Sequence, residues 1–188
     1  MSSFQFEAIG THWQIDIHQS FSQLSKLQKV IEKRIDTFDR HYSRFRQDSL
    51  VWDLYQHPQA IQLPHDAKPL FDLYQQLYQL THGKFTPLIG QVMEQAGYDQ
   101  TYTLKPKKLT SPPAWESIHY NFPHLTTHQP ILIDLGAAGK GYLVDIIAEL
   151  LQANQIQHFS IDAGQDILHH HPNQPLRIGL EHPKSAQH

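Results

Sequence analysis

Apolar residues at helical spacing mark three segments of this chain. The first segment carries them at offsets of three and four: Leu24, Leu27, Ile31, Ile35 and Phe38. This pattern predicts an amphipathic helix over residues 22–39. A second stripe runs from Leu70 to Leu80 and stops before Gly83, and a third runs from Leu143 to Leu151 before Asn154. Because Gly and Asn are favoured just after a helix, both stripes predict helices that end there.

Alternation and short apolar runs predict strands elsewhere. Residues 13–17 alternate apolar and polar side chains, as a half-buried strand does, and residues 4–6 precede them across a short turn. Residues 159–162 and 176–180 are further short runs in which we expect strands. Between residues 101 and 130 the chain is rich in Pro, Thr and His, which predicts a hairpin or a long excursion over the surface. Together these patterns predict an α+β fold.

Residues 131–145 are the most distinctive stretch. An apolar run at residues 131–135 leads into Gly-Ala-Ala-Gly and then into the third helical stripe. We expect a strand, a bend at residues 136–139 with little side-chain bulk, and a helix, which with the strand at 159–162 form a βαβ-like unit. Backbone can approach a ligand closely at such a turn, and the helix N-terminus offers N–H groups to an anion. The glycine spacing excludes a dinucleotide fingerprint and a P-loop, and a tight turn with a solvated Lys140 is the alternative.

Composition narrows the class of protein. A length of 188 residues favours one domain with room for a core, and a net charge of −3 indicates no basic face for nucleic acid. The absence of cysteine excludes disulfides and thiolate metal sites. No apolar run approaches the roughly 18 residues of a membrane span. The first residues lack a signal-peptide pattern, so we expect a cytoplasmic protein.

Histidine is abundant, with 15 residues, and three of them are consecutive at positions 169–171. Neighbouring residues of an extended segment point to opposite faces, so three adjacent imidazoles are poorly placed to bind one ion. We therefore interpret His169, His170 and His171 as part of a solvated loop at a turn, and not as a metal site.

Five segments, in order along the chain, resemble motifs of the ApbE family of FAD:protein FMN transferases. They are Ala-Ile-Gly-Thr at residues 8–11, Tyr-Ser-Arg-Phe at 42–45 followed by Asp48 and Ser49, Phe-Thr-Pro-Leu-Ile-Gly-Gln-Val at 85–92 followed by Ala-Gly-Tyr at 96–98, Asp-Leu-Gly-Ala-Ala-Gly-Lys-Gly-Tyr at 134–142 followed by Asp145, and Asp-Ala-Gly-Gln-Asp-Ile at 162–167. The resemblance implies a single ApbE-like domain over residues 1–188, with mixed sheets packed against helices. The C-terminal part of the family fold is missing from it.

The resemblance also implies an activity. Family members cleave FAD and attach FMN through a phosphoester to a Thr or Ser of an acceptor flavoprotein, a Mg²⁺-dependent reaction known as protein flavinylation. Positioning and charge neutralisation on the pyrophosphate are the tasks that such a phosphoryl transfer leaves to the protein. FAD as substrate, Mg²⁺ as cofactor and a flavoprotein as partner are therefore expected.

The family's site residues carry over position by position. Ile9 stands where a Met packs on the flavin, and Phe45 stands where an aromatic side chain stacks on a FAD ring. Ala137 matches a position whose backbone carbonyl coordinates Mg²⁺. The cofactor-binding positions are Ile9, Phe45, Ile89, Gly90, Gln91, Asp134 and Lys140. The resemblance assigns no catalytic residue within this chain.

Each assignment has an alternative from the sequence itself. Ile9 and Phe45 are also typical core residues, Asp134 can cap the turn that follows it, and Lys140 can be solvated. Asp145 is better interpreted as a solvent-facing or capping residue of the helix.

The chain departs from the family pattern in four places and stops early. Thr86 and Leu88 replace an Asp and a Thr, Gln91 replaces a Pro, and Gln165 replaces a Gly. The family's later Asp-Ala and Thr metal segment has no counterpart after residue 183. We therefore keep two alternatives to a transferase: a degenerate FAD-binding domain without activity, and a structural or partner-binding domain such as a homodimer.

Overall fold

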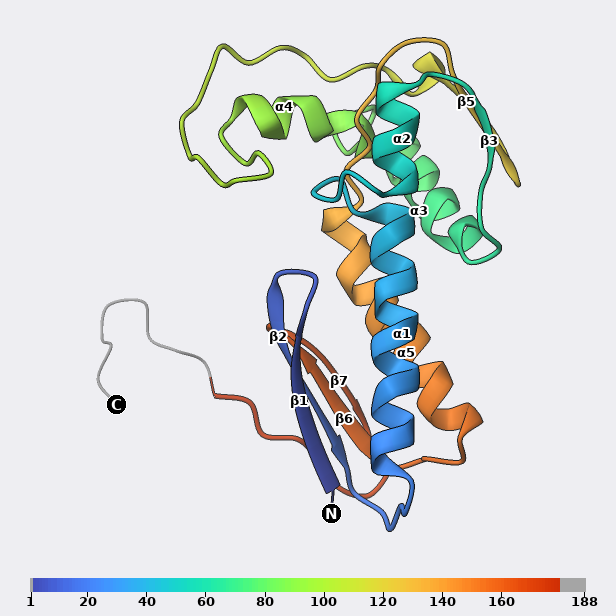
Figure 1. Ribbon diagram of the computed structural model, residues 1–188, viewed down its shortest axis with the longest axis vertical. Helices are drawn as coiled ribbons and strands as arrows, with labels where there is room; N and C mark the ends of the chain where they lie inside the picture. Colours follow the sequence, from blue (N-terminus) through green and yellow to red (C-terminus); the bar gives the residue numbers. More distant parts are fainter. Residues whose placement is uncertain (1, 180–188) are drawn as a thin grey trace. The chain divides into compact units, whose positions relative to one another are not determined.

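The protein is described by a computed structural model that covers residues 2–179, and these residues divide into two units (Figure 1). Unit 1 contains the chain up to Gln28 and the chain from Val144 onward, and unit 2 contains Lys29–Leu143. The helices α1 (Leu24–Tyr42) and α5 (Gly136–Ala153) each contribute residues to both units. The predicted α+β fold is confirmed, with two antiparallel sheets and helices in one chain.

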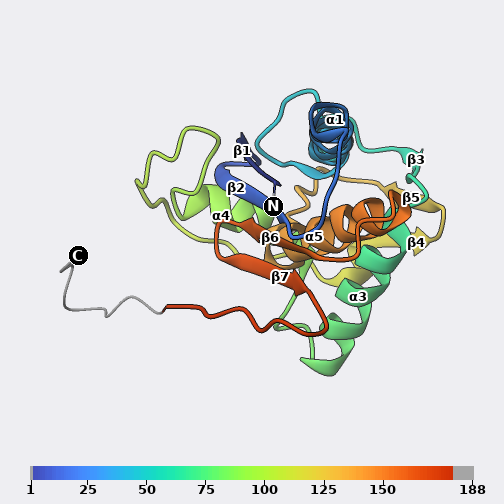
Figure 2. The ribbon, with the colours of Figure 1, turned by 90° about the horizontal axis from the view of Figure 1, so that it is seen from below.

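Unit 1 is built on a four-stranded antiparallel sheet in the order β1-β2-β6-β7 (Figure 2). Its strands are β1 (Ser2–Ala8), β2 (Thr11–Ile17), β6 (Phe159–Ala163) and β7 (Asp166–His170). The alternation predicted for residues 13–17 is confirmed, because Trp13, Ile15 and Ile17 are fully buried while the residues between them are partly exposed. Ile15 pairs with Ile161 in the neighbouring strand, so the apolar positions of β2 and β6 fall on one face.

The core of unit 1 combines this face with apolar helix residues. Val144, Ile147 and Leu151 of α5 are buried, as is Leu27 of α1. Their spacing of three and four residues is the one that predicted the helices. Helix α1 begins and ends within three residues of the expected positions, and α5 ends directly before Asn154 as expected.

Unit 2 contains most of the helices and a small three-stranded antiparallel sheet in the order β3-β5-β4. Its elements, besides parts of α1 and α5, are α2 (Leu50–Gln56), β3 (Ala60–Gln62), α3 (Ala67–Leu80), the 3₁₀ turn η1 (Pro87–Ile89), α4 (Gly90–Gln95), the 3₁₀ turn η2 (Trp115–Ser117), β4 (Ile118–Asn121) and β5 (His124–Thr127). The hairpin expected between residues 101 and 130 is β4–β5. The core of unit 2 is formed by side chains from several elements. Its fully buried residues include Ile31, Leu54, Leu70, Phe71, Tyr74 and Leu125.

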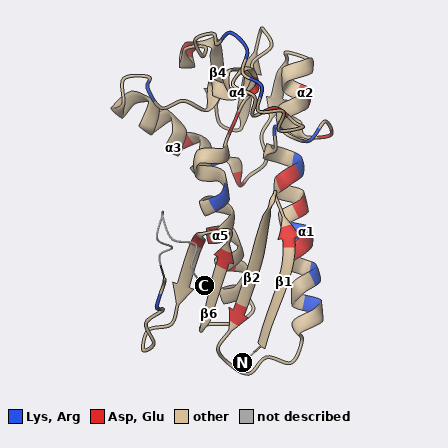
Figure 3. Ribbon diagram, turned by 90° about the vertical axis from the view of Figure 1, so that its left-hand side faces the viewer, with Lys and Arg blue, Asp and Glu red and all other residues tan. Residues whose placement is uncertain are grey.

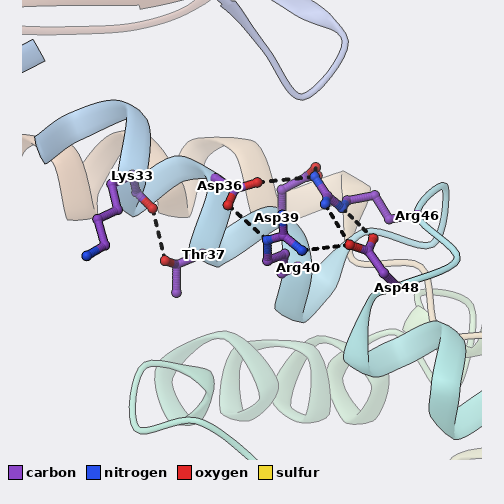
Figure 4. A network of polar contacts seen from close by, with 7 residues as sticks. All are labelled: Lys33, Asp36, Thr37, Asp39, Arg40, Arg46 and Asp48. Carbon is purple, nitrogen blue, oxygen red and sulfur yellow. Dashed lines mark hydrogen bonds and ion pairs between the residues drawn. The ribbon is translucent and has the colours of Figure 1, made fainter. Parts of the chain in front are cut away.

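An ion network joins the C-terminal part of α1, which carries both signs of charge (Figure 3), to the loop that follows it. Arg46 contacts Asp36, Asp39 and Asp48, and Arg40 contacts Asp36 and Asp48 (Figure 4). The Arg46 guanidinium lowers the pKa of Asp48. Exposed ion pairs of this kind contribute only about 0–1 kcal/mol each, so the network mainly fixes the path of the loop at residues 43–48.

Several predictions about residues 131–180 are wrong. Residues 131–135 are almost fully buried but form no strand. Their backbone makes hydrogen bonds with the turn at residues 87–90 and not with a neighbouring strand. Gly90 N–H donates to Leu132 O, and Asp134 N–H donates to Pro87 O. The expected bend at residues 136–139 is the first turn of α5, and β6 is antiparallel to its neighbours, so no βαβ unit forms. Residues 176–179 have no regular structure, and residue 180 lies outside the described residues.

Within residues 2–179, no helix is long and apolar enough to cross a membrane.

Candidate functional site

A buried arginine lies at the centre of the candidate site in unit 2. Arg44, in the loop between α1 and α2, has a side chain that is only 3% exposed. Its Nε donates to Asp134 Oδ2 at 2.6 Å, and its Nη1 lies 3.4 Å from Glu94 Oε1 in α4. Burial raises the pKa of Glu94, and the charge of Arg44 offsets that effect only in part. Neither Arg44 nor Glu94 was predicted from the sequence, although Arg44 directly precedes the motif aromatic Phe45.

Asp134 uses both carboxylate oxygens within the protein. Oδ2 accepts from Arg44, and Oδ1 accepts from the N–H of Gly136 at 2.7 Å, which is the capping role that the sequence left open. The N–H groups of Ala138 and Gly139 also have protein acceptors, Tyr74 Oη for Ala138 and Leu135 O for both. The start of α5 therefore offers an anion fewer N–H donors than the sequence suggested.

The predicted backbone cradle at residues 89–91 lies directly against the Asp134 segment. Gly90 N–H donates to Leu132 O at 3.1 Å, and a Cβ on Gly90 would lie only 2.5 Å from that oxygen. Glycine is therefore needed for this close approach. Gln91 Nε2 lies 3.4 Å from Tyr55 Oη. Thr86, which replaces the family Asp, accepts the N–H of Leu88 and so caps η1.

Three aromatic rings gather beside Arg44. Phe45 stacks on Tyr102 with ring centroids 5.3 Å apart and planes 12° apart, and Tyr98 meets Tyr102 edge-on at 6.1 Å. The Arg44 guanidinium carbon lies 4.0 Å from the centroid of the Phe45 ring. The alternative that Phe45 is a core residue is wrong, because the residue is 38% exposed. Tyr102 lies outside the motif segments, and no local pattern predicted its contact with Phe45.

The surroundings of Ala137, the predicted Mg²⁺ position, differ from those of a metal site. Ala137 is exposed in the first turn of α5, where a helical carbonyl oxygen points along the axis toward the N–H of Gly141. Across residues 2–179, no three His, Asp or Glu side chains are arranged to hold an ion. Lys140 is half-buried in the same helix.

The first and fifth motif segments meet in unit 1. Ile9 is half-buried at the tight turn between β1 and β2 and has a positive φ of 43°. Gly164, in the turn between β6 and β7, approaches Thr11 so closely that a Cβ on it would lie 2.7 Å from Thr11 Cβ. Gln165 has a φ of 79°, a left-handed conformation that the Gly of the family adopts more easily.

A histidine cluster lies at the end of the unit 1 sheet. His169 Nε2 lies 2.6 Å from the carbonyl oxygen of Gln174, which can only accept, so Nε2 carries the proton and Nδ1 accepts from Ser160 Oγ at 2.8 Å. His18 Nε2 completes the chain of bonds to Ser160 at 2.8 Å. The rings of His158 and His171 are 4.5 Å apart. The interpretation of residues 169–171 as a solvated loop is therefore wrong, because His169 and His170 end β7.

We expect the stability of this protein to fall as the pH drops below about 6.5, the ordinary value for histidine. Burial, and the neighbouring imidazoles of His158, His18 and His169, lower the pKa of His171. Just below pH 6.5, His171 binds a proton in the unfolded chain but stays neutral in the folded chain. Lowering the pH therefore favours the unfolded state. The measurement is urea unfolding from pH 7.5 to 5. His171→Gln should flatten the dependence and His128→Gln should not, whereas equal slopes in all three proteins would contradict the prediction.

The comparisons with known proteins agree with the fold. The ApbE family profile matches residues 9–188. A point variant of flavin transferase ApbE from Vibrio cholerae superposes with a TM-score of 0.83 at 20% identity, over 97% of this chain and 68% of that chain. Flavinyl transferase ApbE from Pseudomonas stutzeri gives a TM-score of 0.71 at 17% identity, over 86% of this chain and 58% of that chain.

A third structure is similar in the same way. The ApbE protein from Thermotoga maritima gives a TM-score of 0.69 at 18% identity, over 87% of this chain and 56% of that chain. The matches to these structures thus span between 56% and 68% of their lengths. No curated protein sequence matches. Because the family profile covers nearly the whole sequence, this chain belongs to the ApbE family.

Proposed function

We propose that this chain binds FAD and acts in flavin transfer, the movement of FMN from FAD to a Thr or Ser of an acceptor flavoprotein. Family membership and the flavin transferases among its structural neighbours support the proposal. The observation that carries it is the meeting of three motif segments in unit 2. Arg44, beside Phe45, bonds Asp134, and the segment of Asp134 bonds Pro87 and Gly90.

In this proposal each segment binds a different part of FAD. Phe45, which is 38% exposed, supplies the aromatic ring on which a flat ring of FAD stacks. The backbone at residues 89–91 can approach the ligand closely because Gly90 lacks a side chain. Asp134, held by Arg44, keeps a fixed orientation toward the cofactor, and Lys140 supplies a positive charge. Three further expectations stay predictions. They are a contact of Ile9 with the flavin, a single domain over residues 1–188 and a homodimer.

The described residues do not fit Mg²⁺. This ion prefers several oxygen ligands in octahedral geometry, whereas both oxygens of Asp134 accept hydrogen bonds and Ala137 lies within a helix. We therefore expect FAD to bind these residues equally well with and without Mg²⁺. The same observation favours the second candidate function for this chain, which is FAD binding without turnover.

FAD binding tests the proposal directly. Titration of the chain into FAD, followed by flavin fluorescence, should show saturable binding. Phe45→Ala should weaken it by about tenfold, because stacking on an aromatic side chain contributes about 1–3 kcal/mol per base. Leu73→Ala is the matched control, since Leu73 is 40% exposed and Phe45 is 38% exposed.

The outcomes separate the two candidate functions. Cleavage of bound FAD, with FMN appearing on an acceptor, would support transfer, and intact bound FAD would support binding without turnover. If the wild-type chain and both variants leave the fluorescence of FAD unchanged, FAD is not its ligand and the proposal fails.

A further inference from the structure

We propose that Tyr102 covers the ring-binding face of Phe45, so that a flat ring of FAD stacks there only after Tyr102 has moved away. The inference rests on the proposed function and goes beyond it, because it assigns control of ligand affinity to a residue outside the family motifs.

The spacing of the two rings leaves no room for a ligand between them. Phe45 and Tyr102 are 5.3 Å apart at their centroids and nearly parallel. A ring inserted between two aromatic rings needs a gap of about 7 Å, which is two contact distances of about 3.5 Å. A ligand ring must therefore replace Tyr102 on Phe45.

The other neighbour of Phe45 is much less free to move. The Arg44 guanidinium also contacts the ring, but Arg44 is 3% exposed and is bonded to Asp134 and Glu94. Moving it would leave two partly buried carboxylates unpaired. Tyr102, in contrast, is 54% exposed. Of the two groups on Phe45, Tyr102 is the one that a ligand can displace.

The loop that carries Tyr102 is closed mainly by its own bonds. Asp99 Oδ1 accepts the N–H groups of Thr101 and Thr103 at 3.0 Å, and Leu104 N–H donates to Gly97 O at 3.0 Å. The hydroxyl and N–H groups of Thr103, followed by those of Thr101, hold the pKa of Asp99 at about 2. The loop can therefore keep its internal structure while Tyr102 leaves Phe45.

The backbone of the loop makes the closed position easier to leave. Tyr102 has a φ of 48° and Leu104 a φ of 52°, in the left-handed region that bulky residues rarely adopt. The strain at Tyr102 acts against the stacking energy that holds its ring on Phe45. The free energy needed to move Tyr102 off Phe45 is therefore small, because the backbone strain at Tyr102 is released when a ligand ring takes its place.

The test compares Tyr102→Ala, Tyr102→Phe and Leu109→Ala by flavin fluorescence and stopped flow with FAD. Removing the cover should tighten binding by about 2- to 12-fold, the equivalent of one aromatic pair, and should raise the association rate. Tyr102→Phe keeps the ring and should behave like the wild type. Leu109→Ala is the control for an exposed apolar residue, since Leu109 is 55% exposed and Tyr102 is 54% exposed.

Separate titrations with FMN and ADP show which ring uses the site, because only the ring that stacks on Phe45 should gain affinity in Tyr102→Ala. If Tyr102→Ala binds FAD more weakly, Tyr102 is a wall of the site and the inference is overturned. If it binds with unchanged affinity and rate, Tyr102 covers nothing and the inference is also overturned, while the proposed function stands. Failure of every protein to bind rejects both proposals.

Discussion

Arg44→Met is expected to destabilise the folded chain by about 3–5 kcal/mol, the range for removing one partner of a buried ion pair. Arg44 is 3% exposed, and its partners Asp134 and Glu94 are 16% and 30% exposed. Without the guanidinium both carboxylates stay desolvated and unpaired. Burial already raises the pKa of Glu94, and Arg44 opposes this rise more strongly than Lys107 does, so the charged form depends mainly on Arg44.

Urea unfolding at pH 7 measures this loss, and Arg40→Met provides the control. Arg40 also contacts two carboxylates, those of Asp36 and Asp48, but it is 52% exposed, so its removal should change stability by less than about 1 kcal/mol. Replacing Asp134 with Asn in the Arg44→Met protein should recover part of the loss, because one unpaired charge disappears. A similar small effect from both single variants would show that Arg44 is better solvated than its burial indicates.

Tyr74→Ala is expected to destabilise the protein by about 3–5 kcal/mol, the range for truncating a large buried aromatic residue. Tyr74, in α3, is 1% exposed and stacks on Phe85 with ring centroids 5.4 Å apart. Its hydroxyl accepts the N–H of Ala138 in the first turn of α5, 3.2 Å away. The variant therefore removes packing from the core of unit 2 and a hydrogen bond from the start of α5.

Tyr74→Phe separates these two contributions. It keeps the ring and loses the hydroxyl, so a loss of about 1 kcal/mol is expected, because Ala138 N–H also lies 3.3 Å from Leu135 O. Tyr98→Ala is the control at a tyrosine that is 48% exposed. Unfolding in denaturant compares the three proteins, and a Tyr74→Phe loss as large as that of Tyr74→Ala would contradict the assignment to packing.

The same tyrosine predicts an alkaline limit to stability. Burial raises the pKa of Tyr74 to about 12, and the charge of Asp134 acts in the same direction. Above pH 10 the unfolded chain releases this proton while the folded chain retains it, so stability should fall between about pH 10 and 12.

Local patterns predicted the helices α1, α3 and α5 and the strands β1, β2 and β6, because their spacing of apolar residues has one structural solution in each case. The stripe from Leu24 to Phe38 gave α1, and the alternation at residues 13–17 gave β2. An apolar run such as residues 131–135 has no such unique solution. Its backbone bonds to Pro87 and Gly90, which lie more than forty positions away in sequence and carry no local signal of that pairing.

The sequence by itself determined the family and the positions of its motifs, because these depend on residue identity and order. The tertiary structure decided which side chains meet. It paired Arg44 with Asp134 across 90 positions in the sequence. It also stacked Tyr102 on Phe45, whose side chain stays partly exposed. It also joined His18 to Ser160 across 142 positions. Such contacts arise from the packing of distant elements, and no periodicity within a short window encodes them.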